Sequence, residues 1–184
     1  MKQKKENGMT LIALAITIIV LAIIAAISIT AGGNVIRASQ LESLKTNMLL
    51  IQAKTKEYVE EVSFKRGPVH EADIENIRSE IYEQKGGLIN SVSVDAPNEV
   101  KELVSKLSAE NGNVYYYVPR EALDKVGLSS VEEGKSGDYY VVQFDEDEVT
   151  VEVFNTKGFR NDSKYYYSLT QLEQIEEVKW KRKN

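Results

Sequence analysis

Cysteine is absent from the 184-residue sequence, and histidine and tryptophan occur once each. The lack of cysteine excludes disulfide bonds, thiolate catalysis and cysteine-ligated metal sites. A single histidine cannot form a two-histidine metal site, and no Ser/His/Asp set or glycine-rich phosphate loop accompanies it. We therefore predict that the protein is not an enzyme. Disulfides are not needed for folding, because a domain of this size can bury a hydrophobic core.

Positive charge is also scarce over most of the chain. The whole sequence has 23 Lys+Arg and 28 Asp+Glu, a net charge of -5. Residues 1–8 hold three lysines and one glutamate, so the remainder has 20 basic and 27 acidic residues, a net charge of -7. An acidic body argues against broad electrostatic binding to nucleic acid or anionic lipid. Nucleic acid is therefore not an expected partner.

One long apolar stretch stands out, the 23 uncharged residues from Met9 to Ala31. A helix of this length spans roughly 35 Å, which is enough for a bilayer core of about 30 Å. No later stretch is long and apolar enough to do the same. The lysines lie before this stretch, so the positive-inside rule places the N-terminus in the cytoplasm and Gly32 to Asn184 outside. We expect a single-pass protein of the cell membrane.

The residues around the start of this stretch indicate more than an anchor. A short basic leader ends at Gly8, and Met9 is followed by Thr10, Leu11, Ile12, Ala13 and Leu14. This segment resembles the N-terminus of type IV pilins and pseudopilins. The resemblance implies that prepilin peptidase cuts between Gly8 and Met9, that Met9 is then N-methylated, and that the helix beginning at Thr10 to Leu14 packs in a filament core. The other interpretations are a plain signal anchor and a secretory signal peptide, whose apolar region is usually shorter.

Ala13 departs from the family pattern, which usually has glutamate at that position. In the family this carboxylate is thought to pair with the N-terminal amine of a neighbouring subunit. Its absence leaves three interpretations: a minor or tip pseudopilin, a pilin-like protein of a Gram-positive bacterium, where similar Thr-Leu-Ile-Ala-Leu starts occur, or a protein that does not polymerise.

A second helix is predicted from Asn34 to Ser63, after a kink, flexible junction or helix end at Gly32-Gly33. Gaps of three and four residues place one stripe on this helix. Its members are Leu41, Leu44, Met48, Ile51, Thr55, Tyr58 and Val62. The stripe could form a coiled coil, but with only about three heptads we favour packing on the protein's own sheet. Gly67-Pro68 should end the helix.

The rest of the sequence predicts short helices and strands. Helices are expected at Glu71–Gln84, Glu99–Leu107, Pro119–Val126 and after a capping box formed by Ser168 and Gln171, through Leu169, Leu172, Ile175 and Val178. Strands are expected at Leu88–Val94, Val114–Val118, and in a hairpin of Tyr139–Phe144 and Val149–Phe154. The predicted fold is α+β, with a long N-terminal helix packed on a small antiparallel sheet, as in pilins. Its parts are a leader (1–8), a transmembrane helix (9–31), a helix continuing into the head (32–66) and an extracytoplasmic α+β head (67–184).

Three surface features are candidate sites. The loop Asp145 to Glu148 holds four carboxylates, so Asp145 and Asp147 are candidate calcium ligands, although a hairpin tip of this kind usually serves solubility. No other cofactor is expected. The tyrosine clusters are more typical of sheet packing than of a binding face, and the basic tail Lys179 to Lys183 is more typical of a solvated chain end than of a polymer-binding site.

These observations lead to one main hypothesis and two alternatives. The main hypothesis is a minor pilin or pseudopilin, a structural subunit of a type IV pilus, competence or type II secretion-like filament. Its partners would be prepilin peptidase, membrane lipid before assembly, and other pilin-like subunits through the N-terminal helix. The first alternative is a non-polymerising, signal-anchored surface protein whose head binds a ligand. The second is a DNA-uptake competence pseudopilin, which only the basic tail supports.

Overall fold

The computed structural model describes residues 11–67, 71–111, 113–125, 127–128, 138–176 and 178. Side chains are described within these ranges from residue 33 onward, except at 34, 71–72 and 109–111. The expected cleavage site at Gly8 and Met9, Thr10 and the basic tail from Lys179 all lie outside the described residues. Leu11 to Leu14 are described as helical backbone only.

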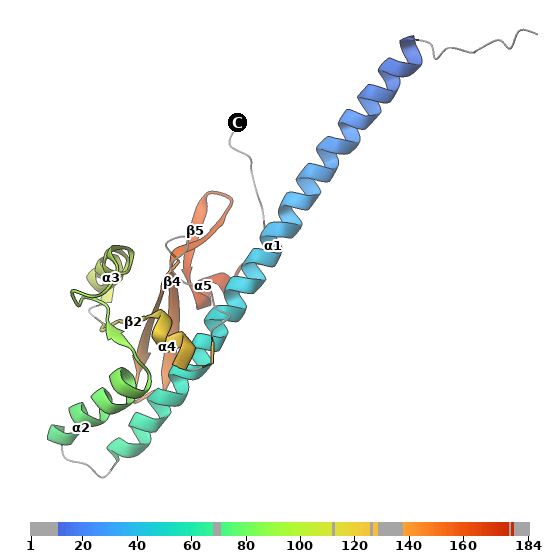
Figure 1. Cartoon of the computed structure of the whole chain (residues 1–184). Helices are drawn as coiled ribbons and strands as arrows, with labels where there is room; N and C mark the ends of the chain where they lie inside the picture. The colour runs from blue at the N-terminus through green and yellow to red at the C-terminus, as the bar shows by residue number, and fades with distance from the viewer. Residues whose placement is uncertain are drawn as a thin grey trace, which may run out of the picture.

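The first element is α1, a 56-residue helix from Leu11 to Arg66 (Figure 1). The expected interruption at Gly32-Gly33 is wrong, because the backbone there is helical. A glycine costs a helix about 1 kcal/mol relative to alanine, and α1 continues despite two of them. The predicted end is confirmed, since Arg66 is the last helical residue and Gly67 begins a turn.

No helix long and apolar enough to cross a membrane is found among the residues whose side chains are described. The expected span, Met9 to Ala31, lies outside those residues.

The head is built on a five-stranded antiparallel sheet in the order β1-β2-β3-β4-β5. The strands are β1 (Ile89–Asn90), β2 (Tyr116–Val118), β3 (Tyr140–Asp145), β4 (Thr150–Asn161) and β5 (Lys164–Ser168). The helices after α1 are α2 (Glu71–Arg78), the π-helix η1 (Ser79–Lys85), α3 (Asn98–Asn111), α4 (Arg120–Lys125) and α5 (Leu169–Glu173). The α+β class and the antiparallel sheet are as predicted.

Two hydrophobic clusters cover opposite faces of this sheet. The larger joins α1 to Val142 and Val153, and the smaller joins Val100 and Val104 of α3 to Val141. Adjacent strand residues such as Val141 and Val142 point to opposite faces, so β3 contributes to both clusters. The molecule therefore has three layers, with α1 on one face of the sheet and α3 on the other (Figure 1).

The stripe predicted on α1 is the face that packs on the sheet. Met48 and Val62 are 0 % exposed, and Leu44 is partly buried against the same cluster. The buried members of the stripe are Leu41, Met48, Ile51, Thr55, Tyr58 and Val62. The described contacts thus bear out packing on the protein's own sheet.

Strand β4 runs antiparallel to α1 along the length of the head. Arg66 of α1 pairs with Asp147 just before β4, Gln52 donates to the Val151 carbonyl at 2.8 Å, and Arg37 donates to the carbonyl of Arg160 near the end of β4. The helix from Arg66 back to Arg37 and the strand from Asp147 to Arg160 each span about 43 Å. These matched lengths let the two elements stay in contact from one end of the head to the other.

The second half of β4 corrects the predicted hairpin. The strand was expected to end at Phe154, but it passes through an irregularity between Phe154 and Phe159 and continues to Asn161. The buried Asn155 side chain accepts hydrogen bonds from the backbone N–H groups of Lys157 and Gly158. Gly158 has φ +64, and a Cβ there would lie 2.7 Å from the Tyr167 ring. Glycine is therefore required where β4 bends.

Two other predicted elements are shorter than expected. The strand expected over Leu88–Val94 is only β1, because a turn begins at Ser91. The terminal helix is only α5, although its capping box is confirmed: Ser168 accepts from Gln171 N, and the Gln171 side chain accepts from Ser168 N. Leu169, Leu172 and Ile175 are buried as predicted.

The packing of α1 can be tested with two adjacent residues. Ile51 is 2 % exposed and Leu50 is 41 % exposed. We predict that Ile51→Ala lowers the free energy of unfolding by about 2–5 kcal/mol, because it removes buried methyl groups and leaves a cavity. Leu50→Ala, the matched control, should cost well under half of that. Chemical denaturation of the full chain in detergent measures both. Equal losses would mean that the outer face of α1 is also packed.

Candidate functional site

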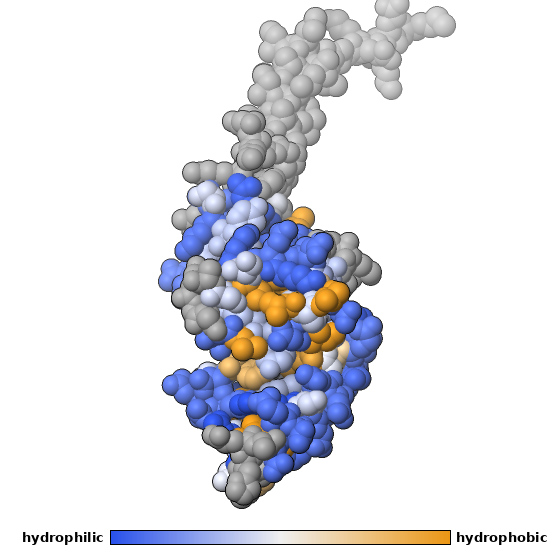
Figure 2. All heavy atoms as spheres, turned by 90° about the vertical axis from the view of Figure 1, so that its left-hand side faces the viewer, coloured by the Kyte–Doolittle hydropathy of each residue, from blue (hydrophilic) through white to orange (hydrophobic). Residues whose placement is uncertain are grey.

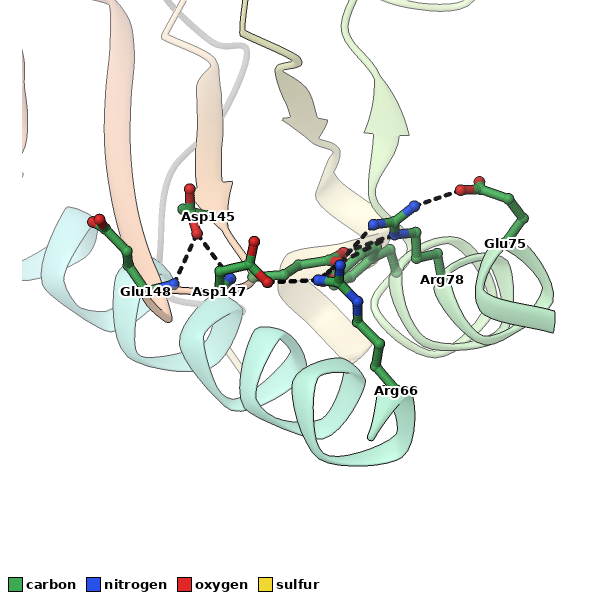
Figure 3. Close-up of polar contacts among 8 residues, drawn as sticks. Arg66, Glu75, Arg78, Asp145, Asp147 and Glu148 are labelled. Carbon is green, nitrogen blue, oxygen red and sulfur yellow. Dashed lines mark hydrogen bonds and ion pairs between the residues drawn. The ribbon is translucent and has the colours of Figure 1, made fainter. Parts of the chain in front are cut away.

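The acidic loop singled out in the sequence forms the turn between β3 and β4 (Figure 3). This turn lies far from the N-terminal half of α1 (Figure 1). One carboxylate oxygen of Asp145 accepts hydrogen bonds from the backbone N–H groups of Asp147 and Glu148, both at 2.8 Å. This is an Asx-type turn, in which an aspartate side chain replaces a backbone acceptor. One oxygen of this candidate calcium ligand is therefore used to shape the loop.

Glu146 is the buried member of the loop, with a side chain only 9 % exposed. Its carboxylate accepts from Arg78 through Nε at 2.9 Å and Nη2 at 2.7 Å, which is a two-point contact. The Tyr82 hydroxyl donates to the same carboxylate at 3.0 Å. Arg78 ends α2 and Tyr82 lies in η1, so Glu146 ties the hairpin to both helical segments.

A second arginine joins the cluster from the end of α1. Arg66 Nη1 lies 2.7 Å from Asp147 and 3.9 Å from Glu146 (Figure 3). Arg78 also pairs with Glu75. Three parts of the chain, α1, α2 with η1, and the β3–β4 turn, therefore meet through alternating charges. We call this set, formed by Arg66, Glu75, Arg78, Tyr82, Asp145, Glu146, Asp147 and Glu148, the charged cluster.

The environment of the charged cluster shifts the pKa values of its members. Burial opposes the ionisation of Glu146, but the hydrogen bonds from Arg78 and Tyr82 outweigh it and hold the pKa of Glu146 below its usual range. The hydrogen bond from Arg78 to Glu146 raises the arginine pKa. Burial, reinforced by the negative charge of Glu146, raises the pKa of the Tyr82 hydroxyl. At neutral pH the cluster therefore holds Glu146 charged and Tyr82 protonated.

The charged cluster can attach three parts of the chain to one another by electrostatic attraction. Asp147 faces Arg66, and Glu146 faces Arg78, so a cation entering here would compete with guanidinium groups. Among the described residues, no group of three or more His, Asp or Glu side chains is placed to hold a metal ion. A calcium site at Asp145 and Asp147 stays an untested prediction. Sequence reasoning missed Arg66, Arg78 and Tyr82, because nothing in their local sequence indicates contact with a turn some 70 residues later.

The tyrosines are divided between the core and the surface. Tyr115 and Tyr117 are buried against α3, while Tyr116 points to the other face and stacks on Phe144 at 5.1 Å. In β5, Tyr165 is 49 % exposed and stacks with Tyr167 at 6.1 Å. The prediction of sheet packing is confirmed for the first cluster, and Tyr165 remains accessible.

One face of the head bears exposed apolar side chains (Figure 2). Figure 2 shows that apolar side chains lie in small groups near the middle of this face and that charged and polar side chains surround them. Val92 and Val94 lie in the loop after β1, and Val114 lies in the loop before β2. These exposed apolar residues are therefore not on a helix face. This face carries no single continuous apolar surface.

The role of the charged cluster can be tested by removing each arginine separately. Arg78→Gln leaves the buried Glu146 without its guanidinium partner, and we predict a loss of about 1–3 kcal/mol in the free energy of unfolding at pH 7. Arg66→Gln, the control, removes a partner of Asp147, whose side chain is 80 % exposed, and should cost at most about 1 kcal/mol. Chemical denaturation of the full chain measures both losses.

The pH dependence of the free energy of unfolding tests whether the interaction between Glu146 and Arg78 is electrostatic. The folded pKa of Glu146 is lowered, so its stabilisation is present above the unfolded value of about 4.3 and is lost as the pH falls through the folded pKa. The difference between the wild type and Arg78→Gln should therefore shrink on acidification below pH ~4. A difference that persists at low pH would show that Arg78 stabilises the head by packing instead of by charge.

Comparison of the chain with protein-family models, curated proteins and solved structures finds no match.

Proposed function

We propose that the protein is a pilin-like structural subunit, a minor pilin or pseudopilin of a type IV pilus, competence or type II secretion-like filament. The observation that supports this proposal most strongly is that α1 has two parts, of which only the second has described contacts with the head. The helix has 56 residues, about 84 Å in length, and its described contacts with the head run only from Arg37 to Arg66. The N-terminal part of α1 extends away from the head (Figure 1).

A subunit of a helical filament needs a head attached to one side of the helix, so that neighbouring subunits can reach the other side. The sheet covers only the stripe of α1 that contains Met48 and Val62. Val35, Leu49 and Phe64 are 69 %, 45 % and 86 % exposed. At 100° per residue they lie on the face opposite the stripe. Large apolar side chains on an open helix face are compatible with burial against a neighbouring subunit.

The sequence supplies the assembly part of the proposal. Gly8 and Met9 provide the cleavage point for prepilin peptidase, and the uncharged segment to Ala31 resides in the cell membrane before it enters a filament. The head lies on the extracytoplasmic side. Ala13 in place of glutamate removes the usual carboxylate-amine pairing, which favours a minor or divergent subunit. The proposal requires no cofactor and no nucleic acid.

Processing at Gly8 is the most direct test of this proposal. When the full chain is expressed with a prepilin peptidase, we predict that the membrane-extracted protein begins at Met9 by intact-mass measurement and N-terminal sequencing. Gly8→Ala should leave the chain starting at Met1. Gly67→Ala is the matched control, because a Cβ there meets only the Phe64 carbonyl oxygen, at 3.7 Å. A wild-type chain that starts at Met1, or after Ala31, would refute the proposal.

Replacement of the apolar segment separates assembly from simple anchoring. We predict that exchanging Met9 to Ala31 for an unrelated transmembrane helix of the same length keeps the head in the membrane but removes the protein from the fraction sheared off the cell surface. The reason is that filament packing depends on the identity of the helix, whereas anchoring depends only on its hydrophobicity. Unchanged surface fractionation and function after the exchange would instead support the non-polymerising anchored protein.

A further inference from the structure

The two ends of the head carry opposite charge. At the end reached by Arg66, the charged cluster has two arginines and five carboxylates, those of Glu75, Asp145, Glu146, Asp147 and Glu148. At the end reached by Arg37, the β4–β5 hairpin contributes Lys157, Arg160 and Lys164. Acidic residues are present there too, since Asp138 lies beside Lys157 and Asp162 lies beside Arg160. The chain is acidic on average, but this end of the head is basic. We call this end the basic tip and define it as Arg37, Lys157, Arg160 and Lys164.

A cation–π contact, hydrogen bonds and an ion pair hold the residues of the basic tip in place, at the end of the head reached by Arg37. Arg37 lies over the Phe159 ring at 5.2 Å and donates to the Arg160 carbonyl. Arg160 donates through Nε to the Asp162 carbonyl at 3.0 Å. Lys157 lies 3.4 Å from Asp138, so this one cation is partly neutralised. Arg160 and Lys164 are exposed, and no carboxylate among the described side chains pairs with either of them.

The position of the basic tip follows from the alignment of β4 with α1. Arg37 lies six residues beyond Ala31, which is about 9 Å along a continuous helix. The headgroup layer of one leaflet extends about 5–8 Å from the hydrocarbon core. From Arg160 the strand continues for about 7 Å to the turn at Asp162 and Ser163. The closed end of the hairpin points toward the same end of the molecule as the N-terminal half of α1 (Figure 1). With the anchor in a bilayer, this turn therefore lies at headgroup level.

Aromatic side chains accompany the charges at the basic tip. The Arg160 guanidinium lies 6.0 Å from the centre of the Tyr165 ring, and Lys164 Nζ lies 4.9 Å from the centre of the Tyr166 ring. Tyr165 is half exposed. Tyrosine is enriched at membrane-water interfaces, because its ring is apolar and its hydroxyl is polar.

We propose that the closed end of the β4–β5 hairpin docks on the anionic lipid headgroups of the leaflet that α1 leaves. The inference rests on the proposed function, since it requires α1 to be anchored. Arg160, Lys164 and Arg37 attract lipid phosphates, while the acidic end of the head faces away from the membrane. Each basic side chain near an anionic surface changes the ratio of docked to undocked heads about five-fold. Docking holds the head against the membrane until its helix is drawn into a filament.

The absence of cysteine makes this proposal directly measurable. The full chain with Ser163→Cys is labelled with a fluorophore and inserted into nanodiscs that contain headgroup-labelled quencher lipid. We predict strong quenching in bilayers containing phosphatidylglycerol and weak quenching in phosphatidylcholine alone. A label at Glu148→Cys, at the other end of the head, should stay unquenched in both. High salt should reverse the quenching at position 163, because it screens exposed charges.

Variants that remove positive charge distinguish docking of the hairpin from an effect of the net charge of the chain. Arg160→Gln with Lys164→Gln should reduce the docked-to-undocked ratio about 25-fold, at five-fold per charge, while Arg160→Lys should retain it. Lys54→Gln with Lys56→Gln removes the same net charge from the middle of α1 and should change nothing. Equal quenching in both lipids, or no effect of the paired substitution, would overturn the inference.

An extraction step distinguishes this outcome from failure of the anchor. If the chain stays in the bilayer after an alkaline wash but position 163 is unquenched, only the docking inference fails. If the wash removes the chain, the proposed anchoring fails and docking fails with it.

Discussion

One stripe of α1, from Leu41 to Val62, is buried against β3 and β4, and this contact determines where the rest of the head lies. It aligns β4 antiparallel to the helix, so that Asp147 meets Arg66 and Arg160 meets Arg37. Burial of apolar surface supplies the energy of the contact but gives it no direction. The polar contacts at its two ends, together with Gln52 and the Val151 carbonyl, fix the register. The second face of α1 stays open, which a filament subunit requires.

Electrostatics act differently at the two ends of this arrangement. At the charged cluster, Glu146 is largely shielded from water and is compensated by Arg78 and Tyr82, which fastens α2 and η1 to the hairpin. Arg66 and Asp147 fasten the last turn of α1 to the same hairpin. At the basic tip, Arg160 and Lys164 remain in contact with water and can exchange it for phosphate. The same strand, β4, therefore connects an end where the shielded carboxylate of Glu146 is paired internally to an end where the basic side chains of Arg160 and Lys164 are exposed. In an anchored protein this difference orients the head along the membrane normal.

Much of the fold could be predicted from local sequence patterns. The stripe on α1, its end at Gly67, the capping box at Ser168 and the β3–β4 hairpin all depend on residues within a few positions of each other, and all are confirmed. The prediction was wrong at Gly32-Gly33, where helix propensity alone suggested an interruption, and at Phe154, where the Asn155 to Gly158 segment is a bulge within a strand instead of its end. The partners of Glu146 could not be foreseen, because they depend on a contact between segments more than 60 residues apart. The anchor and cleavage site remain predictions.

The central claim is that one continuous helix, α1, joins the proposed membrane segment to the head. Amide hydrogen exchange of the full chain in nanodiscs measures this at the two glycines between them. The account predicts that Gly32 and Gly33 exchange as slowly as the middle of α1, because their amides take part in a continuous helix and open only with it. Fast exchange at these two residues, with protected helix on either side, would show that anchor and head are independent units and would contradict the account.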